Sequence, residues 1–357
     1  MKKAGIITFE FNYNYGAILQ ATALADVVRS HGYAVEIVDR GWGITPPQCN
    51  NRLSISKLVG KYYSLRALEG FKRRHWTLSR KVQADADIAR LLDSYDRVIT
   101  GSDQIWNSAC VPTMGLYYFG CHAAPEKVVA YAPSFGHKRF DADAGCIGTL
   151  RAHLQRCRAL SVREADGLEL LRTVFGIEGA ERVLDPTMLH DADYYRRLAG
   201  VRRARRTRTL AYYLLDHSPE KQAAVERLAA AHGLKPVSIN KPVDNGVPVL
   251  GRLRALRYPS VENWLRKIDE AAMVVTDSFH GTVFSILFEK RFVAFGNEKR
   301  GNSRFHNLLG MFGLEHRLTT PELCDSVAAA DIDYAAVRTE LQRMRARSME
   351  YIDKALR

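Results

Sequence analysis

Short apolar segments alternate with longer segments of helical spacing along most of the chain. Apolar runs bounded by turn residues predict buried strands, and they lie at 4–9, 34–39, 97–100, 127–134, 159–164 and 181–186. Residues 17–32 carry apolar side chains at helical spacing and end in Gly32, which predicts an amphipathic helix with a glycine stop. Strands rich in Val and Ile that alternate with helices are typical of a parallel sheet with helices on both faces. The pattern therefore predicts an α/β fold.

A second series of the same kind follows a polar, arginine-rich stretch at 199–208. At 357 residues the chain is also too long for one ordinary core. The sequence therefore predicts a second α/β domain. Its expected elements are strands at 209–215, 235–240, 273–278 and 291–296, helices at 219–233, 260–271 and 281–290, and a final helical stretch from about Tyr334.

The boundary between the two domains is expected near 190–208, where the composition changes. We place the first domain at 1–195 and the second at 196–330. Residues 331–357 are expected to form a C-terminal helical segment that packs back on the first domain. Segment 44–95 is less regular than its surroundings, which predicts a helical insertion in the first domain.

The composition excludes several classes of protein. Hydrophobic residues at 46% and charged residues at 25% are typical of a soluble globular protein. No apolar run approaches the roughly 20 residues that span a bilayer, and the first ten residues match a strand better than a signal peptide. The six cysteines form no C-x-x-C pair and have no histidine at zinc-site spacing. We expect a cytoplasmic protein with neither a disulfide framework nor a bound metal.

The formal charge of +13 comes largely from three arginine-rich runs, at 201–208, 71–76 and 341–347. Such runs could neutralise the phosphates of nucleic acid. They lack interleaved aromatics and match no nucleic-acid motif, so we expect no nucleic-acid partner. Three interpretations stay open: peripheral contact with an anionic membrane at the inner face of the cell membrane, binding of anionic substrates, and a solvated basic surface.

Polar residues follow four of the expected strands, at 10–17, 100–107, 161–167 and 276–282. In open parallel sheets, ligands bind at the carboxyl ends of the strands, where the amino ends of helices point inward. These four stretches are therefore the candidate functional segments. The chain contains no P-loop, dinucleotide-binding, H-E-x-x-H or G-x-S-x-G motif, which argues against P-loop and NAD chemistry.

The stretch at 100–107 combines an aromatic ring with hydrogen-bonding groups. Asp103, Gln104 and Asn107 surround Trp106 in the sequence. Apolar stacking combined with hydroxyl hydrogen bonds suits a sugar ligand. The alternative is structural: Asp103 caps a helix and Trp106 packs in the core between the two domains.

Two further stretches offer charged groups at the ends of expected strands. A guanidinium such as that of Arg163 can bind phosphate or carboxylate through two parallel hydrogen bonds; the alternative is a structural ion pair with Glu164. His280 opens an apolar helix, whose amino end attracts anions. The neighbouring Gly281 would let a ligand or a facing loop approach the backbone closely. A buried or capping histidine is the alternative for His280.

Seven stretches taken together resemble the polysaccharide pyruvyl transferase family. The resemblance runs in order from residue 12 to about 315, and GSDQ-W-N followed by SFHG is its most specific part. The seven stretches are NYGAILQATAL, TGSDQIWN, YAPSFG, SVREADG, VLDPTML, VVTDSFHGTVFSILF and GNSRFHNLLGMFGL.

This resemblance implies a fold and a reaction. The family is similar in fold to GT-B glycosyltransferases, so two Rossmann-like domains would face each other across a cleft, the first on the acceptor side and the second on the donor side. The reaction would transfer the pyruvyl group of phosphoenolpyruvate to hydroxyls of a sugar, usually as a cyclic ketal. The acceptor would belong to a cell-surface polysaccharide or to its lipid-linked precursor. No cofactor or metal is implied, and phosphoenolpyruvate would be a co-substrate.

The resemblance also implies roles for individual residues. The family's anion-gripping arginine falls on Arg163, and its histidine falls on His280 as a donor-site ligand and candidate general acid. Better-known members have Arg-Leu-His where this chain has Ser278, Phe279 and His280, so one cation of the donor site is missing. The candidates to replace it are Lys299, Arg300 and Arg304.

On the acceptor side, Asp103 is the candidate base or the carboxylate that orients the acceptor. The other residues expected to line the acceptor subsite are Asn14, Tyr15, Gln104, Trp106 and Asn107. Two other functions stay open: a GT-B-like glycosyltransferase that uses a nucleotide sugar, and a non-catalytic carbohydrate-binding protein.

Overall fold

The computed structural model describes residues 1–10, 14–41, 66, 68–202, 205–239, 259–296 and 302–357. These residues form two compact units. Residues 44–65 and 67 of the expected insertion at 44–95 lie outside the described residues. The first unit comprises Met1–Pro47, His75–Leu189 and Thr339–Arg357, and the second comprises Gln48–Arg74 and His190–Arg338.

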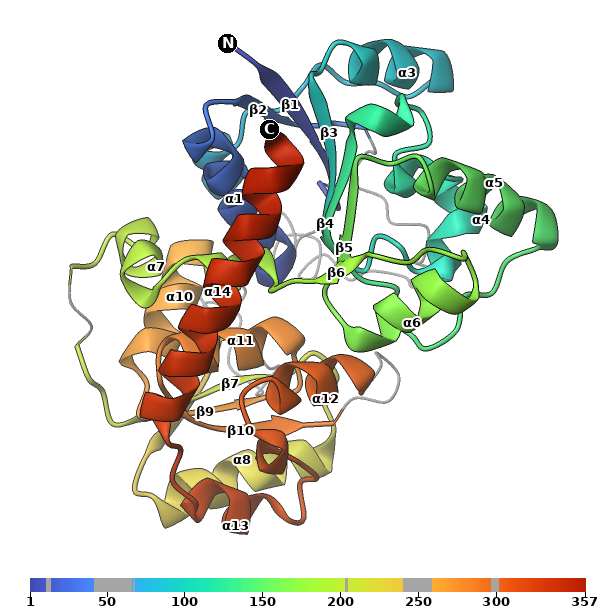
Figure 1. Ribbon diagram of the computed structural model, residues 1–357. Helices are drawn as coiled ribbons and strands as arrows, with labels where there is room; N and C mark the ends of the chain where they lie inside the picture. The colour runs from blue at the N-terminus through green and yellow to red at the C-terminus, as the bar shows by residue number, and fades with distance from the viewer. Residues whose placement is uncertain (11–13, 42–65, 67, 203–204, 240–258, 297–301) are drawn as a thin grey trace, which may run out of the picture. The chain divides into compact units, whose positions relative to one another are not determined.

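The first unit is built on a six-stranded parallel sheet (Figure 1). The strand order is β2-β1-β3-β4-β5-β6, and every neighbouring pair is parallel. β1, β3 and β4 are almost wholly buried, as expected of strands covered on both faces. The strands are β1 (Lys3–Ile7), β2 (Ala34–Ile37), β3 (Arg97–Asp103), β4 (Val128–Pro133), β5 (Ala159–Val162) and β6 (Glu181–Arg182).

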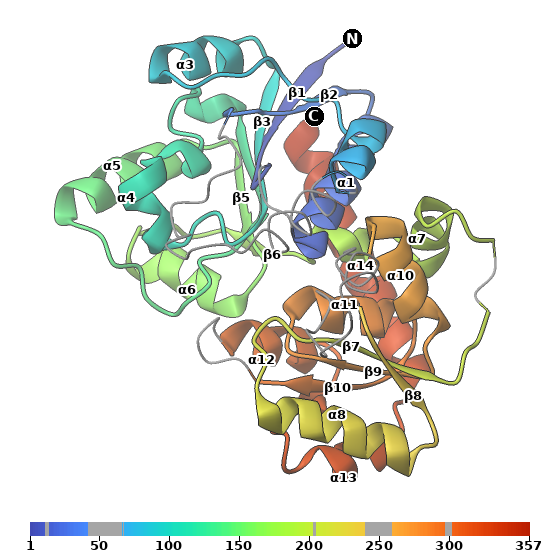
Figure 2. The ribbon, with the colours of Figure 1, turned by 180° about the vertical axis from the view of Figure 1, so that it is seen from behind.

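Helices cover both faces of this sheet. α1 and the later part of α14 lie on one face, and α5 and α6 lie on the other (Figures 1 and 2). The helices are α1 (Tyr15–Ser30), α3 (Asp85–Asp93), α4 (Val111–Met114), α5 (Ala144–Leu154), α6 (Ala165–Thr173) and α14 (Tyr334–Leu356). Short 3-10 helices are η1 (Ser108–Cys110), η2 (Tyr117–Phe119), η3 (Pro125–Lys127) and η4 (Pro186–Leu189).

The last helix, α14, is an integral part of the first unit. The Tyr351 hydroxyl donates to the Ala130 carbonyl in β4 (2.8 Å), and the Ser348 hydroxyl accepts from the Leu184 N–H (3.0 Å). All four groups are buried, so these bonds lie within the core. Residues 339–357 therefore complete the first unit, while the first turn of α14 belongs to the second.

The second unit is built on a five-stranded parallel sheet in the order β11-β10-β9-β7-β8. The strands are β7 (Thr209–Tyr213), β8 (Lys235–Ser238), β9 (Met273–Thr276), β10 (Arg291–Phe295) and β11 (Leu318–Thr319). Two parallel sheets covered by helices make two Rossmann-like units, so the predicted fold class is confirmed.

Helices also cover both faces of the second sheet. α8 and α13 lie on one face and α10 and α11 on the other (Figures 1 and 2). The helices are α7 (Ala192–Leu198), α8 (Pro219–Ala231), α10 (Val261–Glu270), α11 (Phe279–Leu287), α12 (Ser303–Gly310) and α13 (Cys324–Ala329), with the 3-10 helix η6 (Glu315–Arg317). Within the described part of the chain, no helix is both long and apolar enough to cross a membrane.

Each sheet has one point from which the chain proceeds to opposite sides. β1 lies between β2 and β3, and β7 lies between β8 and β9. Ligands of open α/β sheets bind outside the carboxyl ends of the strands at such a point. Residues 14–17 lie at the start of α1, which follows β1; the stretch at 100–107 contains the end of β3, and the stretch at 276–282 contains the end of β9. The candidate segments therefore occupy the expected end of each sheet.

Candidate functional site

In the second unit, Ser278 holds the start of α11. Its hydroxyl accepts a hydrogen bond from the Gly281 N–H (3.4 Å), and its own N–H donates to the Thr276 hydroxyl (3.1 Å). Serine is among the preferred residues at this N-cap position because its oxygen satisfies an otherwise unbonded helix N–H. Ser278, which stands where the resemblance implies an arginine, therefore has a structural role in this chain.

Asp277 fixes the turn before α11, a role that sequence reasoning missed. Its buried carboxylate accepts from the N–H groups of Leu215 (2.5 Å) and Asp216 (3.1 Å) and from the ammonium of Lys221 (2.7 Å). A buried charge needs such partners to offset its desolvation. The available signal was an acidic residue directly after a central strand. Asp277 thereby joins the loops that follow β9 and β7.

Gly281 is required by the strand rather than by a ligand. A Cβ at this position would lie 2.2 Å from Oγ1 of Thr276, the last residue of β9. The Thr276 hydroxyl is itself held in place, since it donates to the Tyr213 carbonyl (2.8 Å). The expected close approach of a ligand or a facing loop is thus corrected: β9 itself makes the approach.

We expect Gly281→Ala to lower the free energy of unfolding by about 1–3 kcal/mol, since an added methyl group overpacks a filled site. Denaturant unfolding would measure the change. Gly148→Ala is the matched control, because Gly148 lies in α5 and a methyl group added there would have nothing within 4 Å. That substitution should stabilise by about 0.5–1 kcal/mol through helix propensity. Equal effects of the two substitutions would contradict the role assigned to Thr276.

The structure brings three of the predicted donor-site residues together. His280 is buried at the start of α11, and its ring lies edge-on to Phe279 with a 5.2 Å centroid separation. The Arg304 guanidinium, from α12, lies 5.9 Å from the centroid of the same Phe279 ring, a cation–π distance. The other two candidate cations, Lys299 and Arg300, lie outside the described residues. Among the described candidates, Arg304 is thus the cation that contacts Phe279, whose ring also contacts that of His280.

In the first unit, Arg163 is enclosed by carboxylates at the carboxyl end of β5. Its Nε donates to Glu164 (2.8 Å) and its Nη1 to Asp185 (2.7 Å), and all three side chains are buried. Burial by itself lowers the pKa of Arg163, but the charges of Glu164, Asp185 and Asp103 raise it above its ordinary value. The structural ion pair, one of the two interpretations of Arg163, is therefore present, and a role as an anion clamp stays a prediction.

Asp185 is the second residue that sequence reasoning missed. Besides Arg163, its carboxylate accepts from the hydroxyl of Ser102 (3.1 Å) and from the N–H (3.0 Å) and hydroxyl (2.6 Å) of Thr187. Asp185 lies in the VLDPTML stretch, which carried part of the resemblance without a role being assigned to any of its residues. Its bonds to Ser102, in β3, and to Arg163, directly after β5, place the Asp185 carboxylate near the carboxyl ends of both strands.

Asp103 ends β3 in an unusual backbone conformation. Its φ is +68°, and in the neighbouring strand Ala132 has φ +55°. Residues other than glycine rarely adopt this region, and such outliers cluster at functional sites. The Asp103 carboxylate accepts from the Gln104 N–H (2.9 Å), and its charge acts on Arg163. The candidate base and the candidate anion clamp thus lie at the same end of the first sheet.

Two of the predicted acceptor residues act as helix caps. The Asn14 side chain accepts from the Gly16 N–H (2.9 Å) at the start of α1, and the Asn107 side chain accepts from the Ala109 N–H (3.0 Å) at the start of η1. Tyr15 is buried in the first turn of α1. These side-chain oxygens already bond to backbone, so Asn14 and Asn107 contribute at least local structure.

Gln104 and Asn107 lie side by side against Gly136. A Cβ at Gly136 would be 3.0 Å from the side chain of each. Gly136 also has a positive φ of +75°, a conformation that favours glycine. The structure thus brings Gln104 and Asn107 together near the ends of β3 and β4.

Trp106 is a core residue, which corrects the expectation of a sugar-stacking face. The ring is 0% exposed, stacks on Phe119 (5.2 Å between centroids) and contacts Phe135 edge-on. Its indole N–H donates to the Tyr118 carbonyl (3.1 Å). With both the ring and its donor occupied, Trp106 has a structural role, and these contacts lie within the first unit.

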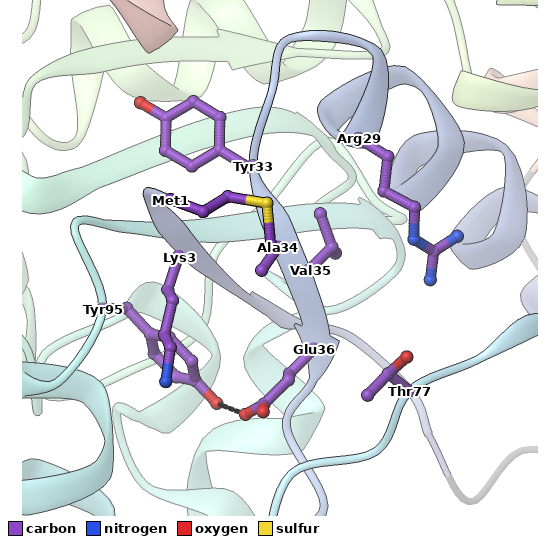
Figure 3. Close-up of a pocket in the computed structure, with 9 residues that line it drawn as sticks. All are labelled: Met1, Lys3, Arg29, Tyr33, Ala34, Val35, Glu36, Thr77 and Tyr95. Atoms are coloured by element: carbon purple, nitrogen blue, oxygen red, sulfur yellow. Dashed lines mark hydrogen bonds between the residues drawn. The ribbon is translucent and has the colours of Figure 1, made fainter.

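A cavity of about 420 Å³ lies at the amino ends of β1 and β2, at the end of the first sheet opposite to the candidate residues (Figure 3). Lys3 and Ala34, at the beginnings of β1 and β2, line it, and the Tyr95 hydroxyl donates to Glu36 at its edge (2.5 Å). None of the candidate residues lines this cavity. Among the described residues, no group of three or more His, Cys, Asp or Glu side chains is arranged to hold a metal ion.

Comparison with known proteins adds the family. The family model for polysaccharide pyruvyl transferases matches residues 14–299. The chain belongs to the polysaccharide pyruvyl transferase family. Membership of this family makes the protein a transferase. The matched range includes every described candidate residue except Arg304. No curated protein sequence matches the chain.

Solved structures agree with the fold of this family member. Anabaena HepE, in complex with UDP and glucose, is 11% identical with a TM-score of 0.52, and the similarity covers 100% of this chain and 98% of HepE. The UDP-GlcNAc 2-epimerase of Neisseria meningitidis, bound to UDP-GlcNAc, is 8% identical with a TM-score of 0.50, covering 100% and 99%. At such low identity the likeness shows the fold alone, which is GT-B-like with two Rossmann-like units.

Proposed function

We propose that this family member transfers the pyruvyl group of phosphoenolpyruvate to hydroxyls of a sugar, forming a pyruvate ketal. The acceptor is a sugar of a cell-surface polysaccharide or of its lipid-linked precursor. The family match over residues 14–299 supports pyruvyl transfer, and the grouping of His280 with Arg304 at the start of α11 supports an anionic donor in the second unit. That grouping is the observation that carries the proposal.

The donor carries a phosphate and a carboxylate, so it needs cations and hydrogen-bond donors. The amino end of α11 favours negative charge because its backbone N–H groups point outward. Arg304 adds a permanent positive charge beside the helix start, where the family's arginine is replaced by Ser278. In this proposal Arg304 holds the donor and His280 supplies the proton.

The chemistry requires one acid and one base. His280 donates a proton to the methylene carbon, which makes it a methyl group and leaves positive charge on the neighbouring carbon. One acceptor hydroxyl attacks that carbon and gives up its proton, and a second hydroxyl does the same as phosphate leaves. Two hydroxyl protons are thus released: one restores His280 and the other leaves with phosphate. Asp103 is the proposed base, with Gln104 and Asn107 beside it on the acceptor side.

The test of this function is direct. The protein is incubated with phosphoenolpyruvate and galactose- or mannose-type acceptors, with and without a chelator. We expect acceptor-dependent phosphate release, a ketal mass increment on the sugar, and no effect of chelation. Phosphate release without a modified sugar, or no turnover with any acceptor, would count against the proposal.

A nucleotide-sugar glycosyltransferase is the second candidate, because HepE shares the fold and contains UDP and glucose. Ligand-dependent thermal stabilisation distinguishes the two. Stabilisation by phosphoenolpyruvate and not by UDP-sugars is expected. The reverse pattern would favour the glycosyltransferase.

Arg304 is expected to act on donor binding. Arg304→Ala should raise the KM for phosphoenolpyruvate by about 10–100-fold, since one hydrogen bond to a charged group contributes about 1.5–3 kcal/mol. Arg304→Lys keeps the charge and should show a smaller increase. Arg227→Ala is the matched control: this arginine pairs with Asp325 at the surface of the same unit, and its loss should leave KM unchanged. An unchanged KM in Arg304→Ala would move the role to Lys299 or Arg300.

A further inference from the structure

The described arginines of the run at 201–208 differ from those of the other two runs in their ion pairing. In the run at 71–76, Lys72 pairs with Glu69 and Arg74 with Glu262. The run at 341–347 is also paired, through Arg343 with Glu340 and Arg347 with Glu181. Surface arginines of this chain are thus commonly neutralised by carboxylates.

No such neutralisation is found at 205–208. Within the described residues, none of Arg205, Arg206 and Arg208 forms an ion pair, and all three are exposed. In the described part of the chain, the Arg208 guanidinium donates to the Gly233 carbonyl, at 3.4 Å. Positive charges that the fold leaves unbalanced are available to a ligand.

These arginines line a hollow of about 630 Å³ together with two further cations from α10, Arg266 and Lys267. One acidic side chain, Glu270, also lines it. Burial lowers the pKa of Lys267, and the positive charge of Arg266 lowers it further. Five cations and one carboxylate therefore share one concave surface.

The backbone that carries the arginines is fixed to α10. The Thr207 N–H and hydroxyl both donate to the Glu270 carbonyl, at 2.9 and 3.0 Å, and the Ala272 N–H donates to the Thr209 carbonyl at 3.0 Å. These bonds hold the loop against the end of α10, so the backbone that carries the cations is fixed before a ligand binds.

The hollow is distinct from the donor site of the second unit. It lies where β7 begins, at Thr209, and where α10 ends before β9. Ser278, Phe279 and His280 follow β9 at its carboxyl end. The two sites are thus at opposite ends of parallel strands.

We propose that this hollow is a second anion site, which binds a phosphate-bearing group through Arg205, Arg206, Arg208, Arg266 and Lys267. Several cations converging on a concave surface match the several oxygens of a phosphate or diphosphate, and guanidinium groups bind such oxygens in pairs. The group belongs either to a free phosphate compound or to a phospholipid headgroup. The site does not depend on the proposed reaction.

The experiment measures binding of inorganic diphosphate, and of vesicles with and without phosphatidylglycerol, to the full chain. The test variant is Arg205→Ser/Arg206→Ser/Arg208→Ser. The control variant, Arg172→Ser/Arg338→Ser/Arg343→Ser, loses the same charge from ion-paired surface positions. We expect saturable diphosphate binding that the test variant weakens at least about tenfold, a factor that one lost charge-assisted hydrogen bond can supply, and that the control variant leaves unchanged.

The two probes distinguish a free phosphate compound from a phospholipid headgroup as the source of the phosphate group. Diphosphate binding with this variant dependence supports a free phosphate compound, and binding confined to phosphatidylglycerol vesicles with the same dependence supports a headgroup. Binding to neither probe, binding only to an RNA oligonucleotide, or an equal loss in both variants overturns the proposal.

Discussion

His280→Ala is expected to lower the rate of pyruvyl transfer by about 10²–10⁴-fold while the protein stays folded, since that is the range that one positioned general acid contributes. The ring lies at the first turn of α11 beside Phe279, and the proposed reaction cannot begin until the methylene carbon receives a proton. The measurement is acceptor-dependent phosphate release at saturating phosphoenolpyruvate, together with the thermal unfolding midpoint.

Two further variants make this result specific. His280→Gln keeps much of the side-chain volume and a hydrogen-bonding amide, but it has no transferable proton, so its rate should fall nearly as far. His316→Ala removes an exposed histidine of the same unit and should leave the rate unchanged. If His280→Gln turns over like the unchanged protein, the histidine does not act as the acid.

Arg163→Met is expected to lower the free energy of unfolding by about 3–5 kcal/mol, the range found when one partner of a buried ion pair is removed. The substitution leaves the carboxylates of Glu164 and Asp185 buried without their guanidinium, and both are less than a tenth exposed. This differs from the simple expectation for an anion clamp, in which activity is lost and the fold is unaffected. Denaturant unfolding measures the change.

Two other substitutions separate stability from donor binding. Arg172→Met removes an exposed arginine paired with Glu169 in the same unit and should not measurably change unfolding. Arg163→Lys keeps the charge but cannot bind both carboxylates through the planar guanidinium. Its free energy of unfolding should therefore lie between those of Arg163→Met and Arg172→Met. An anion clamp predicts instead that Arg163→Lys raises the KM for phosphoenolpyruvate with unfolding unchanged, and that outcome would replace the structural interpretation.

The architecture could be predicted from the sequence because it depends on short-range patterns. Buried parallel strands produce continuous apolar runs, and the runs at 97–100 and 127–134 fall on β3 and β4. Because the strands were expected to be parallel, the segments that follow them along the chain were expected at the carboxyl ends of the strands. The insertion at 44–95 lacks such a pattern, so its limits could not be derived in the same way.

Side-chain roles were harder to predict because they depend on partners distant in the sequence. Trp106 is buried by Phe119 and Phe135, and no local pattern distinguishes a buried tryptophan from one that faces a ligand. Asp277 is fixed by Lys221 from another helix. The pattern puts Ser278 at the end of the strand expected at 273–278, with the helix beginning at 281, whereas Ser278 caps α11, which begins at Phe279.

The place of α14 in the first unit has a consequence for protein synthesis. All six strands of that unit precede the second unit along the chain, but the surface that Tyr351 and Ser348 cover stays open until α14 has been made. The second unit needs only the first turn of α14 and is made in the interval. Exposed apolar surface on a waiting intermediate promotes aggregation. The first unit, whose strands are made before the second unit, is therefore the one that should depend on chaperones until α14 has been made.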